Sequence, residues 1–132
     1  MKKDEFSLIL EDLHKRRIPG EIKKTVQILL DKKAEKITVL KLKGISEMTD
    51  YLVICSGNSA RQNKALADAV KENLKKDLQL QPLGSEGERL SEWILVDYVD
   101  FIINIFSADW RKKFSLEKLW MDAKRYDFSP DF

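Results

Sequence analysis

The sequence predicts an α/β (α+β) protein with a mixed β-sheet of about five strands covered by helices. The first observation is the order of its periodic segments: helix, strand, strand, helix, short strand, strand, strand, helix. The second is composition, since 132 residues that are 43% hydrophobic and 35% charged fit one domain with a sizeable core. The chain is therefore expected to fold without a disulfide or a structural metal.

An appended helix is expected at the N-terminus, in residues 1–20. Its apolar residues recur at helical spacing, and the pair Pro19 and Gly20 ends it. Because this pair separates the helix from the rest of the chain, three roles stay open: docking on the domain, pairing with a partner, or remaining mobile. A second helix follows, with an apolar stripe formed by Ile22, Val26, Leu29 and Leu30.

Two strands and a long helix are expected next. Residues 36–42 alternate in the manner of a strand, and residues 51–55 are continuously apolar, which indicates a strand buried on both faces. Ser59 is expected to cap the following helix, with Gln62 in capping-box spacing. The core stripe of this helix consists of Leu66, Val70, Leu74 and Leu78.

The second half of the chain is expected to complete the sheet. Pro82 and Gly84 mark a short edge element, and residues 93–98 and 101–106 have the spacing of a hairpin. A last helix is expected over residues 108–120. Residues 123–132 are expected as a loose C-terminal tail, because Pro130 opposes further helix.

Composition argues against several classes of protein and site. The apolar runs are far shorter than the roughly 20 residues of a membrane helix. Acidic residues break up any N-terminal targeting pattern, so a cytoplasmic location is expected. Cys55 is the only cysteine and His14 the only histidine, so no intrachain disulfide or Cys/His zinc site can form. We expect no metal and no cofactor.

One segment is locally acidic, although the chain has a net charge of +2. If residues 93–98 form a strand, Trp93 and Asp97 share one face and Tyr98 lies on the other. An aromatic residue among carboxylates repels phosphates and suits docking of a basic protein. The alternative is a solvated hairpin whose Trp93 packs on a neighbouring helix. The five carboxylates, set against Arg89, are Glu86, Glu88, Glu92, Asp97 and Asp100.

Two other functions stay open from the residues alone. A metal-dependent, nucleotidyltransferase-like enzyme would use Asp50, Asp97 or Asp100 with magnesium and would bind a nucleotide at residues 57–61. Aspartates at strand ends more often frame turns, and the same turn residues serve a helix cap. An RNA-binding adaptor of ribosome assembly would use the lysines of residues 23–36, although acidic residues interleave with them and no aromatic platform accompanies them.

Five motifs occur in order along the chain: LDKKAEKI (residues 30–37), MTDYLVICSGNSARQ (48–62), PLGSEG (82–87), EWILVDY (92–98) and LEKLW (116–120). Together they resemble the ribosomal silencing factor family, also called the Iojap family. The resemblance runs over residues 21–122, which we expect to form the silencing-factor domain.

The resemblance implies a homodimer with a nucleotidyltransferase-like fold and no known enzymatic activity. It also implies binding to large-subunit ribosomal protein fourteen on the large ribosomal subunit, which blocks joining of the small subunit and represses translation. A peripheral contact with ribosomal RNA stays open. Many family members have histidines where this chain has Asn104 and Ser107, so any role of those histidines cannot be transferred. The implied ribosomal-protein-binding positions are Gly84, Glu86, Gly87, Trp93, Asp97 and Tyr98, with Glu92 pairing to basic residues of the partner.

Overall fold

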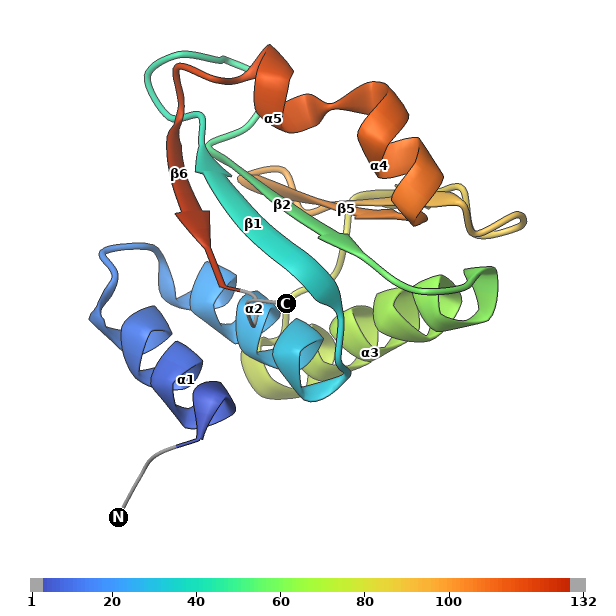
Figure 1. The fold of residues 1–132 in the computed structure, drawn as a ribbon, viewed down its shortest axis with the longest axis horizontal. Coiled ribbons are helices and arrows are strands. Elements are labelled where there is room, and N and C mark those ends of the chain that lie inside the picture. Colours follow the sequence, from blue (N-terminus) through green and yellow to red (C-terminus); the bar gives the residue numbers. More distant parts are fainter. Residues whose placement is uncertain (1–3, 129–132) are drawn as a thin grey trace.

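A single mixed β-sheet with helices on both faces forms the fold in a computed structural model, which describes residues 4–128 (Figure 1). Within these residues the sheet has six strands in the order β3-β4-β5-β2-β1-β6. The predicted fold class is confirmed. The helices are α1 (Glu5–Lys15), α2 (Gly20–Asp31), α3 (Ala60–Leu78), α4 (Ala108–Phe114) and α5 (Leu116–Leu119). The strands are β1 (Glu35–Lys41), β2 (Tyr51–Ser56), β3 (Gly84–Glu86), β4 (Trp93–Asp97), β5 (Phe101–Phe106) and β6 (Lys124–Asp127).

The two faces of the sheet are covered unequally. The larger helices α1, α2 and α3 lie on one face, and the short helices α4 and α5 lie on the other (Figure 1). A large core of buried residues lies under the first group. The core on the second face is smaller, and half-buried aromatic residues such as Trp93, Trp110 and Trp120 pack at its margin. The second face is therefore where large apolar side chains remain within reach of a partner.

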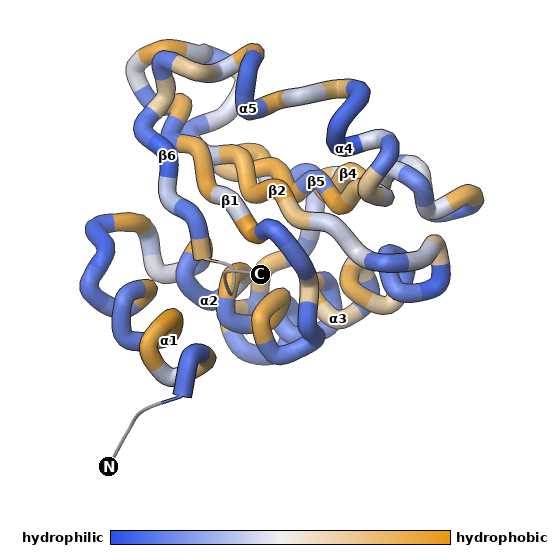
Figure 2. The backbone as a smooth tube through the Cα atoms, in the orientation of Figure 1, coloured by the Kyte–Doolittle hydropathy of each residue, from blue (hydrophilic) through white to orange (hydrophobic). Residues whose placement is uncertain are grey.

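The two central strands are buried at every position, as expected for β2 and as found also for β5. They run parallel in register from Tyr51 opposite Phe101 to Ser56 opposite Phe106. Figure 2, in which the chain is coloured by residue hydropathy, shows these strands as a band of hydrophobic residues between more hydrophilic helices. Continuous apolar sequence follows from this placement, because each face of these strands meets one layer of helices.

The long helix α3 begins at the expected capping box. Ser59 Oγ accepts a hydrogen bond from the Gln62 amide at 3.0 Å, and Gln62 Oε1 accepts one from the Asn58 amide at 2.6 Å. The bond to Ser59 satisfies a donor that the first helical turn leaves unpaired, and the bond to Gln62 ties the residue before the cap to the helix. The hydrogen bonds therefore support the interpretation of this turn as a helix cap.

Of the three roles open for the appended helix, the structure shows docking on the domain. Leu13 of α1 is completely buried in the large core. Arg16, which follows the helix, lies over the ring of Tyr126 at 5.7 Å, and Lys23 Nζ donates to the His14 carbonyl at 2.9 Å. The helix is thus fixed both to α2 and to the last strand.

The expectation of a loose tail is wrong for residues 124–127, which form β6 and pair antiparallel with β1. Charged residues dominate this strand, so the sequence pattern did not predict it. Tyr126 and the following Phe128 are buried in the large core. Two aromatic side chains in the core fix the segment, and an edge strand tolerates charges on its exposed positions. The expected last helix is also divided, because Ser115 adopts a left-handed conformation with φ 45° between α4 and α5.

No helix in the described part of the chain is long and apolar enough to cross a membrane.

Candidate functional site

The candidate site is the open face of β4, next to the edge strand β3. Ile94 and Val96 are fully buried toward the large helices, whereas Trp93, Leu95 and Asp97 are half-buried on the opposite face. The predicted alternation along this strand is therefore confirmed, and Trp93 and Asp97 share a face. The ends of the strand lie about 13 Å apart at the usual rise per residue, so these two side chains mark opposite ends of one surface.

Trp93 has a structural role as well as an exposed edge. Its ring stacks on Phe106 at 5.2 Å and packs against Phe114 of α4 at 4.6 Å. Its Nε1 donates a hydrogen bond of 3.0 Å to Oδ1 of Asn104, which is 3% exposed. Trp93 is accordingly neither a core residue nor a free surface anchor: its packing holds the ring in a fixed orientation with one side open.

A shallow apolar pocket of about 330 Å³ lies beside Trp93. Leu90 is 72% exposed at its margin, and Trp110 of α4 forms its opposite wall. Gly87 has φ +85°, and a Cβ at that position would lie 1.9 Å from the carbonyl oxygen of Trp93. Glycine is required there because the loop passes directly against β4 in a left-handed conformation. The lining residues are Gly87, Arg89, Leu90, Glu92, Trp93 and Trp110.

The acidic residues around this face differ in their hydrogen-bond partners. Glu92 Oε2 accepts a hydrogen bond of 2.7 Å from Trp110 Nε1, which couples the start of β4 to α4. Asp97 Oδ1 accepts one of 2.7 Å from the Val99 amide, so this aspartate frames the turn between β4 and β5 as expected. Glu86 is exposed on the edge strand.

Glu88 belongs to a different cluster, turned toward α3. It pairs with Lys71 at 2.7 Å and accepts a hydrogen bond from Ser85. These two contacts lower the pKa of Glu88 to about 2, with Lys64 adding a weaker contribution at 3.4 Å. Its charge is therefore neutralised within the molecule and contributes little to the acidic rim.

The structure brings together most, but not all, of the positions predicted for the site. In the antiparallel pairing of β3 with β4, Gly84 lies opposite Asp97 and Glu86 opposite Leu95, so both share the face of Trp93. Tyr98 lies on the other face. It is 8% exposed, stacks on Phe101 at 4.9 Å, and has its pKa raised to about 12 by burial.

Sequence reasoning missed the contribution of α4 to this face. Phe114 packs against Trp93, and Trp110 stacks on Phe114 at 5.1 Å and lines the pocket beside Trp93. The spacing of four residues between Trp110 and Phe114 placed them on one helical face, which was the available signal. Nothing in the sequence showed that this helix would lie across β5 beside Trp93. We refer below to Glu86, Leu90, Glu92, Trp93, Leu95, Asp97 and Trp110 as the tryptophan face.

The parts of the alternative enzyme site are separated in space. Asp50 and Asp100 lie before β2 and β5, and residues 57–61 lie beyond the far end of β2. A strand of this length separates them by roughly 20 Å. Among residues 4–128 no group of three or more His, Cys, Asp or Glu side chains is placed to hold a metal ion. The geometry gives this alternative no common site.

Comparison with known proteins decides the family. Residues 15–131 match the family described as ribosomal silencing factor during starvation. The chain belongs to this family. The match extends through β6, so the strand missed by sequence reasoning is part of the family domain.

Individual relatives agree with this assignment. The chain is 40% identical over 97 residues to ribosomal silencing factor RsfS of Bacillus subtilis, covering 74% of this chain and 81% of that protein. It is 39% identical over 94 residues to the protein of the same name from Halalkalibacterium halodurans, covering 70% and 79%. A crystal structure of a Chromobacterium violaceum protein superimposes with a TM-score of 0.75 at 30% identity, covering 80% of this chain and 88% of that one.

Proposed function

We propose that this protein binds the large ribosomal subunit through large-subunit ribosomal protein fourteen and thereby prevents the small subunit from joining. The observation that carries the proposal is the tryptophan face, an open apolar surface with carboxylates at its rim on a chain of the silencing-factor family. The activity is proposed to lie in the cytoplasm, where ribosomal subunits meet, and to repress translation.

The chemistry of the face favours a basic protein partner. Its centre is aromatic and aliphatic, with Trp93 held in place by Phe106 and Phe114. Glu86, Glu92 and Asp97 lie around this centre against one cation of the pocket lining, Arg89. A rim with this excess of negative charge attracts lysine and arginine and repels RNA phosphates. Truncating an aromatic anchor in such a centre often weakens binding by about 2 kcal/mol or more.

The proposed mechanism is steric and requires no bond to be made or broken. The bound domain would cover the part of the ribosomal protein that the small subunit approaches. We propose that the protein has no enzymatic activity and forms a homodimer when it is not bound to a ribosome. Light scattering on the free protein would contradict the dimer if it gave the mass of one chain at micromolar concentration.

The test uses surface substitutions that leave the packing of Trp93 intact. Leu90→Asp places a charge in the apolar pocket, where the native side chain is 72% exposed. Glu86→Lys reverses a charge on the rim. The matched control is Glu72→Lys, an equal change of charge on the exposed side of α3, which lies on the other face of the sheet.

We expect Leu90→Asp to lose co-sedimentation with isolated large subunits and Glu86→Lys to reduce it, so that whole ribosomes form more readily with either variant when small subunits are added. For Leu90→Asp we expect a loss of about 2 kcal/mol, roughly a thirtyfold weaker affinity, because the change puts a carboxylate at the margin of the apolar pocket. Glu86→Lys should act mainly on the association rate and its salt dependence. If all three variants co-sediment like the native protein and block joining equally, the tryptophan face is not the ribosome-binding surface.

A further inference from the structure

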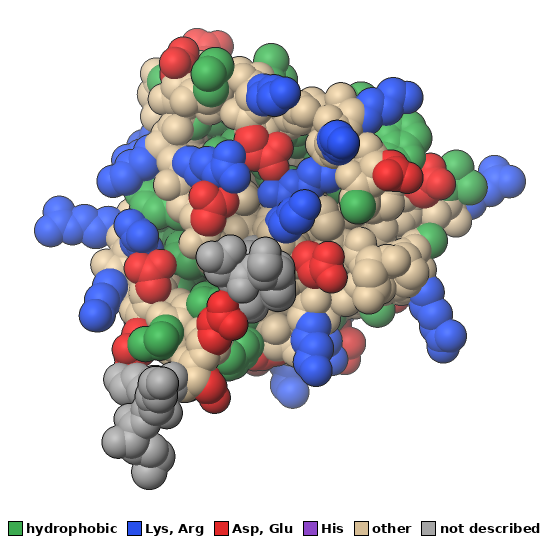
Figure 3. Space-filling view, viewed as in Figure 1, with side chains coloured by type: hydrophobic (Ala, Val, Ile, Leu, Met, Phe, Trp, Pro, Cys, Tyr) green, Lys and Arg blue, Asp and Glu red, His purple; other side chains and the backbone are tan. Residues whose placement is uncertain are grey.

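A second and larger cleft lies on the same side of the sheet, between β1 and β6 on one side and α4 and α5 on the other. Its volume is about 820 Å³, which is within the range of small-molecule sites. Figure 3 shows basic side chains gathered beside acidic ones around this part of the surface. The cleft shares no lining residue with the apolar pocket at Trp93. The two sites lie on either side of α4.

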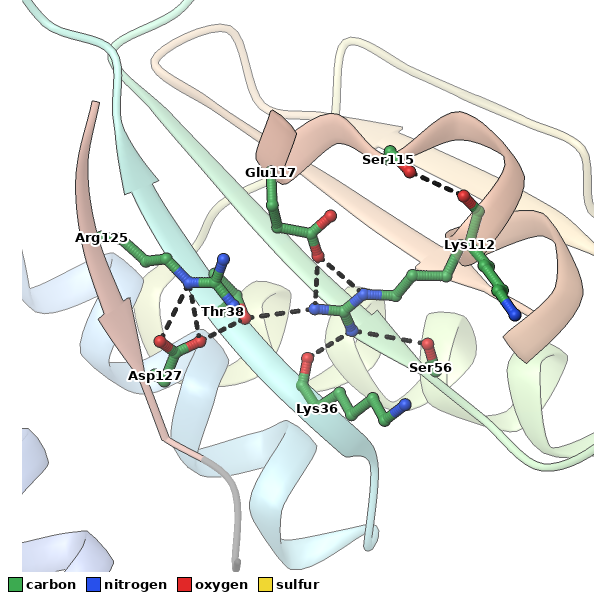
Figure 4. Close-up of polar contacts among 9 residues, drawn as sticks. Lys36, Thr38, Ser56, Lys112, Ser115, Glu117, Arg125 and Asp127 are labelled. Atoms are coloured by element: carbon green, nitrogen blue, oxygen red, sulfur yellow. Dashed lines mark hydrogen bonds and ion pairs between the residues drawn. The ribbon is translucent and has the colours of Figure 1, made fainter. Parts of the chain in front are cut away.

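The floor of the cleft is a polar network centred on Arg111, whose side chain is only 10% exposed. Figure 4 shows the side chains of Thr38, Ser56 and Glu117 that surround it. Arg111 Nε and Nη2 contact Glu117 Oε1 at 2.8 and 2.7 Å. Nη1 donates to the Lys36 carbonyl and, at 3.4 Å, to Ser56 Oγ, while Nη2 donates to Thr38 Oγ1 at 3.1 Å. Every donor group of Arg111 is thus occupied, so Arg111 shapes the cleft and is not itself available to a ligand.

The second ion pair of the cleft, Arg125–Asp127, is about half exposed, with side-chain exposures of 49% and 55%. Arg125 Nε donates to Asp127 Oδ2 at 2.9 Å, and Asp127 Oδ1 accepts from Thr38 Oγ1 at 2.7 Å. With Arg111–Glu117 and Arg125–Asp127 paired, the remaining charged residues that line the cleft are Lys36, Lys112, Lys118, Glu35 and Asp109. Three cations then face two anions, an excess of one positive charge. No ion pair occupies any of these three lysines among residues 4–128.

Lys36 is placed at the cleft by an irregularity of the strand. The pairing of β1 with β2 shifts register between Glu35 and Thr38, and Lys36 has φ 49°. A bulge of this kind redirects a side chain out of the regular alternation. The Arg111 guanidinium holds the carbonyl of Lys36, which leaves its ammonium group free at the rim. Ser56, which accepts from Arg111, retains its own hydroxyl hydrogen as a further donor.

We propose that this cleft binds a phosphate ester, with the phosphoryl group between Lys36 and Lys112 and the Ser56 hydroxyl as an additional donor. Free lysine ammonium groups bind phosphate as point charges. The excess of one positive charge matches a phosphodiester and offsets about half the charge of a monoester, which is mainly dianionic at pH 7. The ester could come from a free nucleotide or from an RNA backbone. The proposal does not depend on the proposed function, because it concerns the isolated protein and residues outside the tryptophan face.

The experiment is a titration of the full chain, without ribosomes, followed by amide chemical shifts in NMR spectra. The probes are adenosine monophosphate, adenosine and an eight-nucleotide oligouridylate. The variants are Lys36→Ala combined with Lys112→Ala, the charge-retaining Lys36→Arg, and the control Lys75→Ala on the exposed side of α3. None of these changes removes a hydrogen bond of the Arg111 network, since Lys36 contributes only its carbonyl.

We expect a phosphate-bearing probe to shift amides around Ser56 and Lys36, and adenosine to leave them unchanged. The double variant should bind at least about tenfold more weakly, while Lys36→Arg and Lys75→Ala stay within about twofold of the native protein. Binding of the nucleotide assigns a free monoester, and binding of the oligouridylate alone assigns an RNA diester. The proposal is overturned if neither phosphate-bearing probe shifts these amides, or if Lys75→Ala weakens binding as much as the double variant.

Discussion

Substitutions of Trp93 can distinguish its hydrogen bond to Asn104, which stabilises the fold, from its proposed contact with the ribosomal protein. In the native protein the Trp93 ring lies 5.2 Å from Phe106 and 4.6 Å from Phe114. The phenyl ring of Trp93→Phe can still contact both, but the indole N–H donor is lost. Asn104 Oδ1 accepts that donor at 3.0 Å and the residue is only 3% exposed, so its carbonyl becomes a buried acceptor without a partner. Such a group costs about 1–3 kcal/mol.

We therefore expect urea unfolding to show a loss of about 2 kcal/mol for Trp93→Phe at an unchanged m-value. Adding Asn104→Leu removes the unpaired acceptor and should restore at least half of that loss. Affinity for purified large-subunit protein fourteen, measured by calorimetry, should fall little in Trp93→Phe. In Trp93→Ala, measured at a temperature where the variant is folded, it should fall roughly thirtyfold.

Two results would refute this reasoning separately. A native midpoint of urea unfolding for Trp93→Phe would show that the hydrogen bond to Asn104 has no net effect on stability. Native affinity in a folded Trp93→Ala variant would show that Trp93 is a structural residue of the hairpin and does not contact the partner, which was the alternative interpretation of this segment.

Three further outcomes follow from other contacts. Gly87→Ala should lower the free energy of unfolding by at least about 2 kcal/mol, since its Cβ would lie 1.9 Å from the Trp93 carbonyl oxygen, whereas Gly20→Ala, with no atom within 4 Å, should not. Arg111→Met should lower the free energy of unfolding, measured by thermal unfolding, by about 2–3 kcal/mol, because Glu117, only 17% exposed, loses its partner. A double-mutant cycle with Glu117→Gln should show that the effects of the two substitutions are not additive. The pKa of Glu88 is lowered to about 2 from 4.5. Glu88→Gln should therefore lower the free energy of unfolding by roughly 1 kcal/mol above pH 4.5, and this difference should disappear as the pH falls toward 2. A difference that does not change with pH would contradict the ion pair with Lys71.

Most elements of the fold could be predicted because their patterns are local. The continuous apolar run of β2 indicated burial on both faces, and the spacing of Ser59 and Gln62 indicated the start of α3; both predictions are confirmed. β6 could not be predicted in this way. Its exposed positions are charged, and only Tyr126 faces the core, so the segment is stabilised by pairing with a strand more than eighty residues earlier.

The site was predictable in part for the same reason. Alternation along β4 placed Trp93 and Asp97 on one face, because the period of a strand is a property of the local backbone. That period could not show whether the Trp93 side chain would be exposed, buried or half-buried. The answer depends on α4, whose Phe114 packs on the ring while Trp110 lines the pocket into which the rest of the ring is open.

The sequence by itself determined the α/β class, the order of the central elements, the acidic and aromatic character of β4, and, through its ordered motifs, the family. Only the tertiary structure decided which of these residues act together. It turned Glu88 toward Lys71 and away from the tryptophan face, buried Tyr98 on the opposite side, and collected Lys36, Ser56 and Lys112 around one cleft. The physical reason is that periodicity and capping depend on neighbours within one helical turn or strand. Charge neutralisation, burial and clefts depend on contacts between segments that are distant in the chain.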